Sequence, residues 1–283
     1  MRTGNGHHDR RKRRDAKGDR PAIWIGYGKL VKLHRERSGL TQQQLAEAMG
    51  YSVEQVASVE QGRRPAKDTF TEAAERALDA RGTLSVLQDD VDLAKLPSFF
   101  VDFALIEAEA VSRFSYDPLL IPGLLQTEEY ARAVFTGNCP PLSDELIEQH
   151  VEARLSRQKL LTRAPAVNVS FIIEERVLLN AVGGRDVLLP QLRRLLDAGA
   201  QRNVEIQVMP SGRGFHPGLN GPMVLLETLE HQHVAYLESH GVGTVVTDPA
   251  KVSSFSLRCG KLRSQALNAE ESARLIDRLA GEA

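Results

Sequence analysis

Cysteine, long apolar runs and the short motifs of common enzymes are scarce or missing in this sequence. The 283 residues include 2 cysteines, Cys139 and Cys259, which are too few for a disulfide framework and lack metal-ligand spacing, so we expect two packed thiols. The longest apolar runs, such as residues 119–125, fall far short of the ~20 residues that a membrane-spanning helix needs. No apolar signal-peptide core follows the basic start. We therefore expect a cytoplasmic protein with no membrane partner.

Catalytic and metal-binding patterns are equally weak. There is no Gly-rich phosphate loop, no GxSxG and no CxxC. Glu230, His231 and His233 lie close together, and both histidines would share one face of a strand, but no third ligand is evident and a solvated hairpin tip is the simpler interpretation. Four other titratable residues would form an acid–base set only if the fold assembled them: Glu174, Glu175, His216 and Asp248. We expect no enzyme, no cofactor and no metal.

The formal net charge of -1 conceals an uneven distribution. Residues 1–80 carry 16 Lys and Arg against 11 Asp and Glu, whereas the remainder carries 20 against 26. The first 20 residues hold 8 of those basic residues and 3 of the acidic ones, without apolar periodicity. We predict a disordered basic arm at 1–22 that attracts nucleic-acid phosphate without sequence preference, with a solvated segment of little function as the alternative.

Helical signals follow the arm as far as Pro97. Ile25, Leu30 and Leu33 recur at helical spacing, which predicts a first helix at 23–38. Caps and terminating glycines predict further helices at about 41–49, 52–61, 67–80 and 84–94. Residues 23–96 should therefore form an all-α domain.

Beyond Pro97 the pattern predicts a helix-rich α+β domain over 97–283, with a small antiparallel or mixed sheet. Helices are expected at 99–114, 127–134, 143–161, 184–200, 249–265 and 269–280, and strands at 167–173, 204–210, in a hairpin within 222–239, and at 243–247. The basic side chains of Arg154, Arg157, Lys159 and Arg163 should form a solvated helix face. The segment IPGLLQTEEYARAVF offers a candidate ligand or partner loop, with a packing element as the alternative, and its residues of interest are Pro122, Gly123, Gln126, Thr127 and Tyr130.

The stretch at 41–62 has the pattern of two short helices joined by a tight turn, as in a helix-turn-helix. Five apolar residues would hold the pair together: Leu45, Ala46, Met49, Val56 and Val59. Four residues of the second helix would then read bases in the major groove: Val53, Glu54, Gln55 and Ser58. Five others are candidates for contacts with the DNA backbone: Gln42, Gln43, Ser52, Arg63 and Arg64.

Residues 35–64, RERSGLTQQQLAEAMGYSVEQVASVEQGRR, resemble the Xre-type helix-turn-helix family, and the resemblance covers about 25–80. It implies a five-helix DNA-binding domain that commonly binds operators as a dimer, and a structural pair between Arg35 and Glu60. One departure is Glu54, an acid beside the expected groove. A helix pair that mediates only protein contacts is the alternative.

The second domain is similar to the C-terminal domain of unknown function in actinobacterial helix-turn-helix regulators, WhiJ-like and often antitoxin-like. The resemblance rests on LIEAEAVSRF, IPGLLQTEEYARAVF, EARLSRQKLL, VEIQVMP, GPMVLLE and HVAYLES. It implies a regulator often encoded beside a very small partner protein. We expect a nucleoid-associated homodimer that binds double-stranded DNA and receives a signal from that protein or from a ligand. The alternatives are an antitoxin-like protein that sequesters its partner and autoregulates its operon and, more remotely, an enzyme tethered to DNA.

Overall fold

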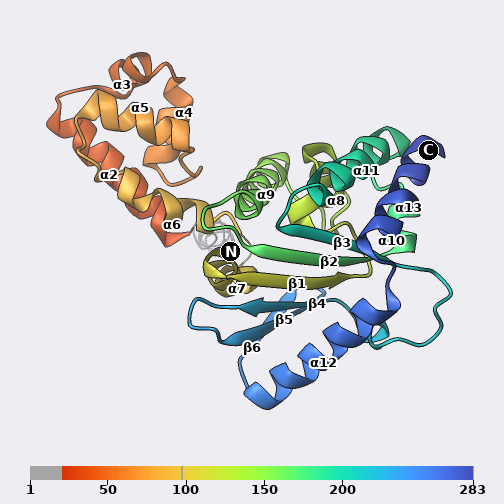
Figure 1. Cartoon of the computed structure of the whole chain (residues 1–283). Helices are drawn as coiled ribbons and strands as arrows, with labels where there is room; N and C mark the ends of the chain where they lie inside the picture. Colours follow the sequence, from red (N-terminus) through yellow and green to blue (C-terminus); the bar gives the residue numbers. More distant parts are fainter. Residues whose placement is uncertain (1–20, 97, 283) are drawn as a thin grey trace, which may run out of the picture. The chain divides into compact units, whose positions relative to one another are not determined.

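The computed structural model describes residues 21–96 and 98–282, which fall into two compact units on either side of Pro97 (Figure 1). Residues 1–20 of the predicted basic arm lie outside this described part. The last two residues assigned to the arm belong instead to the first unit, because Pro21 precedes a helix that begins at Ala22. No helix of the described residues is both long enough and apolar enough to cross a membrane.

The described part of the first unit, residues 21–96, contains helices and no strands, as predicted. Its helices are α2 (Ala22–Arg37), α3 (Gln42–Met49), α4 (Val53–Glu60), α5 (Asp68–Leu78) and α6 (Gln88–Leu93). The last predicted helix is divided, because the 3₁₀ turn η1 (Ser85–Leu87) precedes α6.

The buried face of α2 differs from the predicted one. Trp24, Tyr27 and Val31 enter the core, whereas Leu33 is 45% exposed. Gly28 lies on the same buried face, where a Cβ atom would come within 2.2 Å of the Val59 carbonyl oxygen. The missing side chain therefore lets α2 pack directly on the backbone of α4.

The second unit is α+β, as predicted, and is built on a six-stranded mixed sheet of order β3-β2-β1-β4-β5-β6. Strands β1 (Ser112–Asp117), β2 (Asn168–Glu174) and β3 (Val204–Met209) are parallel. Strands β4 (Met223–Glu227), β5 (His233–Ser239) and β6 (Val242–Val246) extend the sheet by antiparallel pairing.

The central strand β1 corrects the prediction of a helix over 99–114. Helix α7 (Ser98–Glu109) ends earlier, and Ser112–Asp117 forms a strand between β2 and β4. Apolar and polar side chains alternate in this strand, with Phe114 and Tyr116 in the core on one face. Only two residues separate the end of α7 from the start of β1, so local periodicity alone does not mark where the helix stops.

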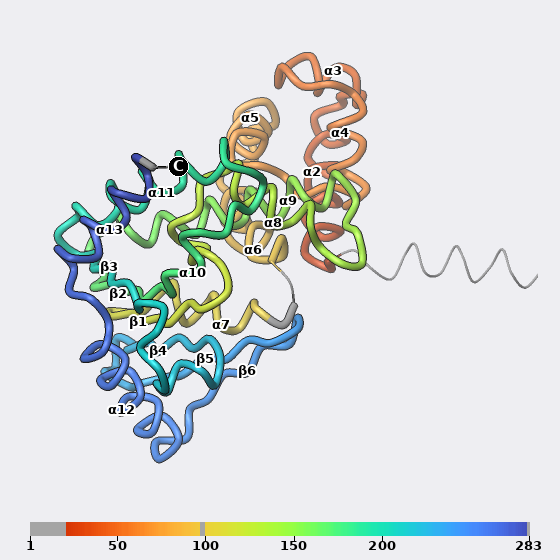
Figure 2. Tube along the Cα trace, turned by 90° about the vertical axis from the view of Figure 1, so that its right-hand side faces the viewer, coloured from red at the N-terminus to blue at the C-terminus, as the bar shows by residue number. Residues whose placement is uncertain are grey.

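Helices cover both faces of this sheet. They are α8 (Glu128–Thr136), α9 (Asp144–Arg157), α10 (Glu175–Leu179), α11 (Arg185–Gly199), α12 (Pro249–Gln265) and α13 (Ala269–Glu282). Short 3₁₀ turns lie at η2 (Gly123–Leu125), η3 (Gln158–Leu161) and η4 (Pro217–Asn220). The cores are separate: Phe171 of β2 packs with residues of α8 and α11, whereas Ile172 packs with Leu262 of α12. Figures 1 and 2 accordingly show α12 across the strands from α11.

Candidate DNA-binding surface

Helices α3 and α4 each begin at a reciprocal capping box. Thr41 Oγ1 accepts a hydrogen bond from the backbone N of Gln44 at 3.2 Å, and Gln44 Oε1 accepts one from the backbone N of Thr41 at 2.9 Å. Ser52 and Gln55 repeat the arrangement at 3.2 and 3.1 Å. Between the helices, Gly50 adopts the left-handed conformation at φ 73°. These local signals fix where both helices start and how the chain turns between them.

The two helices are held together by the apolar side chains that the sequence indicated. All of them are 9% exposed or less: Leu45, Ala46, Met49, Val56 and Val59. Because Val56 and Val59 occupy the inner side of α4, the first turn of this helix is left on the surface.

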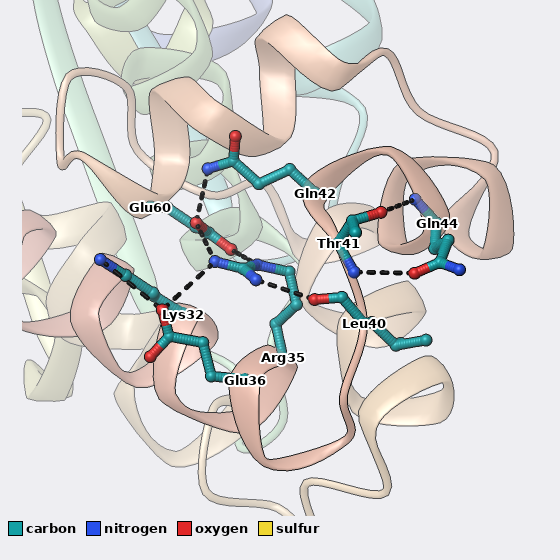
Figure 3. Close-up of polar contacts among 8 residues, drawn as sticks. All are labelled: Lys32, Arg35, Glu36, Leu40, Thr41, Gln42, Gln44 and Glu60. Carbon is teal, nitrogen blue, oxygen red and sulfur yellow. Dashed lines mark hydrogen bonds and ion pairs between the residues drawn. The ribbon is translucent and has the colours of Figure 1, made fainter.

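A buried ion pair joins the end of α2 to the end of α4 (Figure 3). Arg35 Nε and Nη2 donate to Glu60 Oε1 and Oε2 at 2.5 and 3.1 Å, and Arg35 Nη1 donates to the Leu40 carbonyl oxygen at 2.8 Å. Arg35 is 8% exposed and Glu60 is 6% exposed. The hydrogen bond to Glu60 raises the pKa of Arg35, so the guanidinium stays charged inside the unit. The pair that the family resemblance implied is therefore present as a structural contact.

Three of the four candidate base readers are on the surface of α4. Val53 is 37% exposed, Glu54 and Gln55 are exposed, and Ser58 is half-buried. Glu54 lies in the first turn of α4, where exposed backbone N–H groups stabilise a negative charge, so this departure has a structural reason. The capping box engages Gln55 Oε1, which leaves the Nε2 amide as its outward donor.

The candidates for DNA-backbone contacts divide into two kinds. Gln42 is half-buried and donates to Glu60 Oε2 at 2.7 Å, and Ser52 caps α4, so both side chains have structural partners. Gln43 is exposed and donates to Glu47 at 3.2 Å. Arg63 and Arg64 are exposed just after α4. Sequence reasoning missed Gln42 as a third member of the Arg35–Glu60 cluster, because its i, i+18 contact has no local signal.

In the second unit, the residues of the predicted ligand loop are mostly packed. Pro122 is buried, Gln126 is 2% exposed and Tyr130 is fully buried. Gln126 Nε2 donates to the Ile121 carbonyl oxygen at 2.8 Å, and Thr127 caps α8. Gly123 is half-buried beside the Arg154 guanidinium. The side chains of this loop are therefore mainly engaged in stabilising the conformation of the loop and the start of α8.

The predicted solvated face of basic residues is wrong for three of its four members. Arg157 donates to the buried carboxylate of Glu107 through Nη2 at 2.5 Å. Arg154 is half-buried, and Arg163 donates to the Ala110 carbonyl oxygen and is also half-buried. Lys159 alone of the four is exposed. These arginines lie against the α7 and α8 segments because the sheet brings those segments beside α9.

Only two of the four residues of the candidate acid–base set, Glu174 and His216, lie close together in the structure. Glu174 Oε1 accepts a hydrogen bond from the Tyr116 hydroxyl at 2.5 Å and lies 3.5 Å from His216 Nε2, all three being buried. The other two have separate structural contacts: Glu175 accepts from the Ser211 backbone N, and Asp248 caps α12.

The proposed metal-binding trio does not assemble. His231 is exposed and lies 2.8 Å from Glu227, while Glu230 and His233 are exposed on the same hairpin. Within the described part of the chain, no group of three or more His, Cys, Asp or Glu side chains is placed to hold a metal ion.

The fold and this surface define a two-part protein: a helix-turn-helix unit with an exposed second helix, followed by an α+β unit with a mixed sheet. Residues 27–86 match the family described as helix-turn-helix domain, which points to DNA binding. Residues 100–278, more than half of the chain, match the family described as domain of unknown function (DUF5753), and the chain belongs to that family. No curated protein and no solved structure matches the chain.

Proposed function

We propose that the chain is a sequence-specific, Xre-type transcriptional regulator that binds DNA as a dimer with α4 in the major groove. Its second unit would mediate dimerisation and receive a small partner protein or a ligand, acting by binding and not by catalysis. The observation that carries the proposal is the exposed first turn of α4, fixed by a capping box and backed by a buried ion pair. An α-helix fits the ~12 Å width of the major groove, where side chains of its first turns reach base edges.

The contacts within α4 also bear on how Gln55 meets a base. Its Oε1 accepts from the Ser52 backbone N, which uses one of the two lone pairs of that oxygen. Nε2 can donate to an acceptor such as guanine O6, thymine O4 or adenine N7, and the second lone pair of Oε1 remains for the adenine amino group.

The test is selection of binding sequences from random duplex DNA by the full chain, followed by affinity measurements on the selected sequence. Changing Gln55 and Ser58 together to Ala is expected to weaken specific binding by about tenfold or more, because each good base contact contributes ~1–3 kcal/mol. Non-specific binding should stay the same. The matched control changes Gln232 and Ser253 to Ala, a glutamine and a serine exposed on the second unit. An unaltered sequence preference in the α4 variant would refute the assignment.

A further inference from the structure

An excess of positive charge lies inside the second unit, around α9. Arg113 of β1 and Arg157 of α9 both bind Glu107 of α7, through Arg113 Nε at 2.9 Å and Arg157 Nη2 at 2.5 Å. Glu107 is 2% exposed, and both guanidinium groups hold its pKa below the usual range in spite of that burial. One carboxylate therefore serves two guanidinium groups, and Arg113 Nη1 stays buried without a hydrogen-bond partner.

A third guanidinium, that of Arg154, lies one turn before Arg157 and has no carboxylate partner in the described part of the chain. Its Nη1 donates to Gln126 Oε1 at 2.8 Å, and its Cζ lies 4.4 Å from the centroid of the Phe135 ring. Nε and Nη2 make no hydrogen bond with the described residues. Burial and the nearby charge of Arg157 lower the pKa of Arg154 to about 10. Glu238 attracts it electrostatically but forms no ion pair with it.

The polar groups around Arg154 have other partners. Gln126 Nε2 donates to Ile121, and Gln158 Nε2 donates to the carbonyl oxygens of Gln126 and Gly123 at 2.7 and 3.3 Å. A Cβ atom at Gly123 would lie 3.4 Å from Arg154 Nε, so the glycine leaves room beside that donor. The loop is thus fixed in place, while the Nε and Nη2 edge of Arg154 has no hydrogen-bond partner among the described residues.

Arg35 shows what the same edge of a guanidinium does when a carboxylate is present. There Nε and Nη2 hold the two oxygens of Glu60, while Nη1 binds a neutral oxygen, that of Leu40. Arg154 has the neutral oxygen at Nη1 and lacks the carboxylate. A planar two-oxygen anion matches this donor pair in both spacing and charge.

We infer that the Nε and Nη2 edge of Arg154 is the binding site for a small oxyanion, with the carboxylate of a small molecule as its ligand. The inference rests on the proposed role of the second unit in receiving a ligand, and it names the chemical class of that ligand. The Phe135 ring lies against the face of the guanidinium, Gly123 lies beside Nε, and Gln126 orients the guanidinium through Nη1.

The experiment follows the Arg Nε–Hε resonances of the ¹⁵N-labelled full chain during titration with sodium acetate, succinate or phosphate, at constant ionic strength kept with NaCl. The Arg154 resonance is identified by its absence in Arg154→Gln. It is expected to shift and saturate with the carboxylates, and to respond less to phosphate. Arg274, exposed on α13 and paired with Glu270, is the matched control and should not saturate.

Calorimetric melting of Arg154→Lys and Arg154→Gln supplies the second measurement. Lys keeps the charge but lacks the two parallel donors of the guanidinium, so the apparent affinity of Arg154→Lys for the carboxylate should fall by about tenfold or more. In Arg154→Gln, the carboxylate should no longer raise the melting temperature. In the absence of anion, Arg154→Gln should melt at the wild-type temperature or above it, because it removes an unpaired cation; a clear fall would assign Arg154 a purely structural role.

Two further outcomes overturn the inference: an Arg154 resonance that follows Arg274 in every titration, or carboxylate-induced stabilisation that persists in Arg154→Gln. A stronger response to phosphate would keep the oxyanion site and change the source of its ligand. No DNA is present in either measurement, so a negative result leaves the proposed DNA binding untouched.

Discussion

Removing the charge of Glu60 while keeping its shape is the sharpest test of how the DNA-binding unit is held together. In Glu60→Gln, the Arg35 guanidinium would remain 8% exposed, and the exposed Glu36 carboxylate, 3.8 Å from Arg35 Nη2, would be the one carboxylate left near it among the described residues. Removing one partner of a buried ion pair typically costs ~3–5 kcal/mol, because the remaining charge is uncompensated. The Gln side chain still offers one acceptor oxygen to Arg35, so we expect the free energy of unfolding to fall by ~3 kcal/mol, the lower end of that range. A unit of this size has a total stability of ~4–11 kcal/mol, so the variant should fold but be fragile.

Trp24 makes the measurement selective for the first unit. It is the single tryptophan of the chain, is 7% exposed, and donates from Nε1 to the Val91 carbonyl oxygen at 3.0 Å. Urea titration followed by its fluorescence therefore reports unfolding of this unit within the full chain. A double-mutant cycle completes the design, with Arg35→Met, Glu60→Leu and the two changes combined.

The double variant, Arg35→Met with Glu60→Leu, is expected to lose less free energy of unfolding than either single variant. It leaves no buried charge, and apolar side chains fill the space. The coupling energy of the cycle should be ~2 kcal/mol or more. The view that Arg35 and Glu60 stabilise the fold as a pair would be refuted in either of two cases. In one, each single variant loses less than ~1 kcal/mol of unfolding free energy; in the other, the losses of the two single variants add up to that of the double variant.

Two further predictions concern packing and pH. Gly28→Ala should destabilise the first unit by ~1–3 kcal/mol in the same Trp24 assay, because the new methyl group meets the Val59 carbonyl oxygen, whereas Gly26→Ala, with nothing within 4 Å, should stabilise it by ~0.5–1 kcal/mol. Burial raises the pKa of Asp117 from 3.8 to about 6, so the folded state binds its proton more tightly and this contribution to stability is lost as pH rises from about 4 to 6. Asp117→Asn should therefore gain ~3 kcal/mol over wild type at pH 7, at ~1.4 kcal/mol per pKa unit, and show a flatter stability profile by circular dichroism across that range. Equal stability of the two glycine variants, or parallel pH profiles for Asp117→Asn and wild type, would contradict these arguments.

The first unit was predictable because its signals are local. Thr41, Ser52 and Gly50 mark helix ends through contacts only a few residues apart, and the boundaries of α3 and α4 follow from them. The face of α2 was predicted less well. It depends on Gly28, whose importance comes from the α4 backbone and not from its own neighbours in sequence.

The second unit shows where such reasoning stops. Local periodicity predicts the start of β1 as the end of a helix, because the strand is defined by its pairing with β2, 56 positions away between Ser112 and Asn168, and with β4. The burial of Arg154 and Arg157 was missed for the same reason, since helical spacing alone cannot distinguish a basic face in solvent from one that meets Glu107 and Phe135. Residues that act through long-range contacts leave no trace in local periodicity.

Arg35 and Arg154 together show why an unpaired guanidinium calls for an explanation that packing does not supply. Both are recessed and both hold a neutral oxygen through Nη1, but Arg35 also meets a buried carboxylate. If the task of Arg154 were only to cover Phe135 and anchor Gln126, an uncharged side chain such as Gln would serve without the cost of desolvating a cation. The charge itself is therefore the feature to account for. The Arg154 guanidinium has two donors, Nε and Nη2, without a partner among the described residues, and Gly123 lies beside Nε. A bound oxyanion would neutralise this charge and accept from both donors. A purely structural role requires neither.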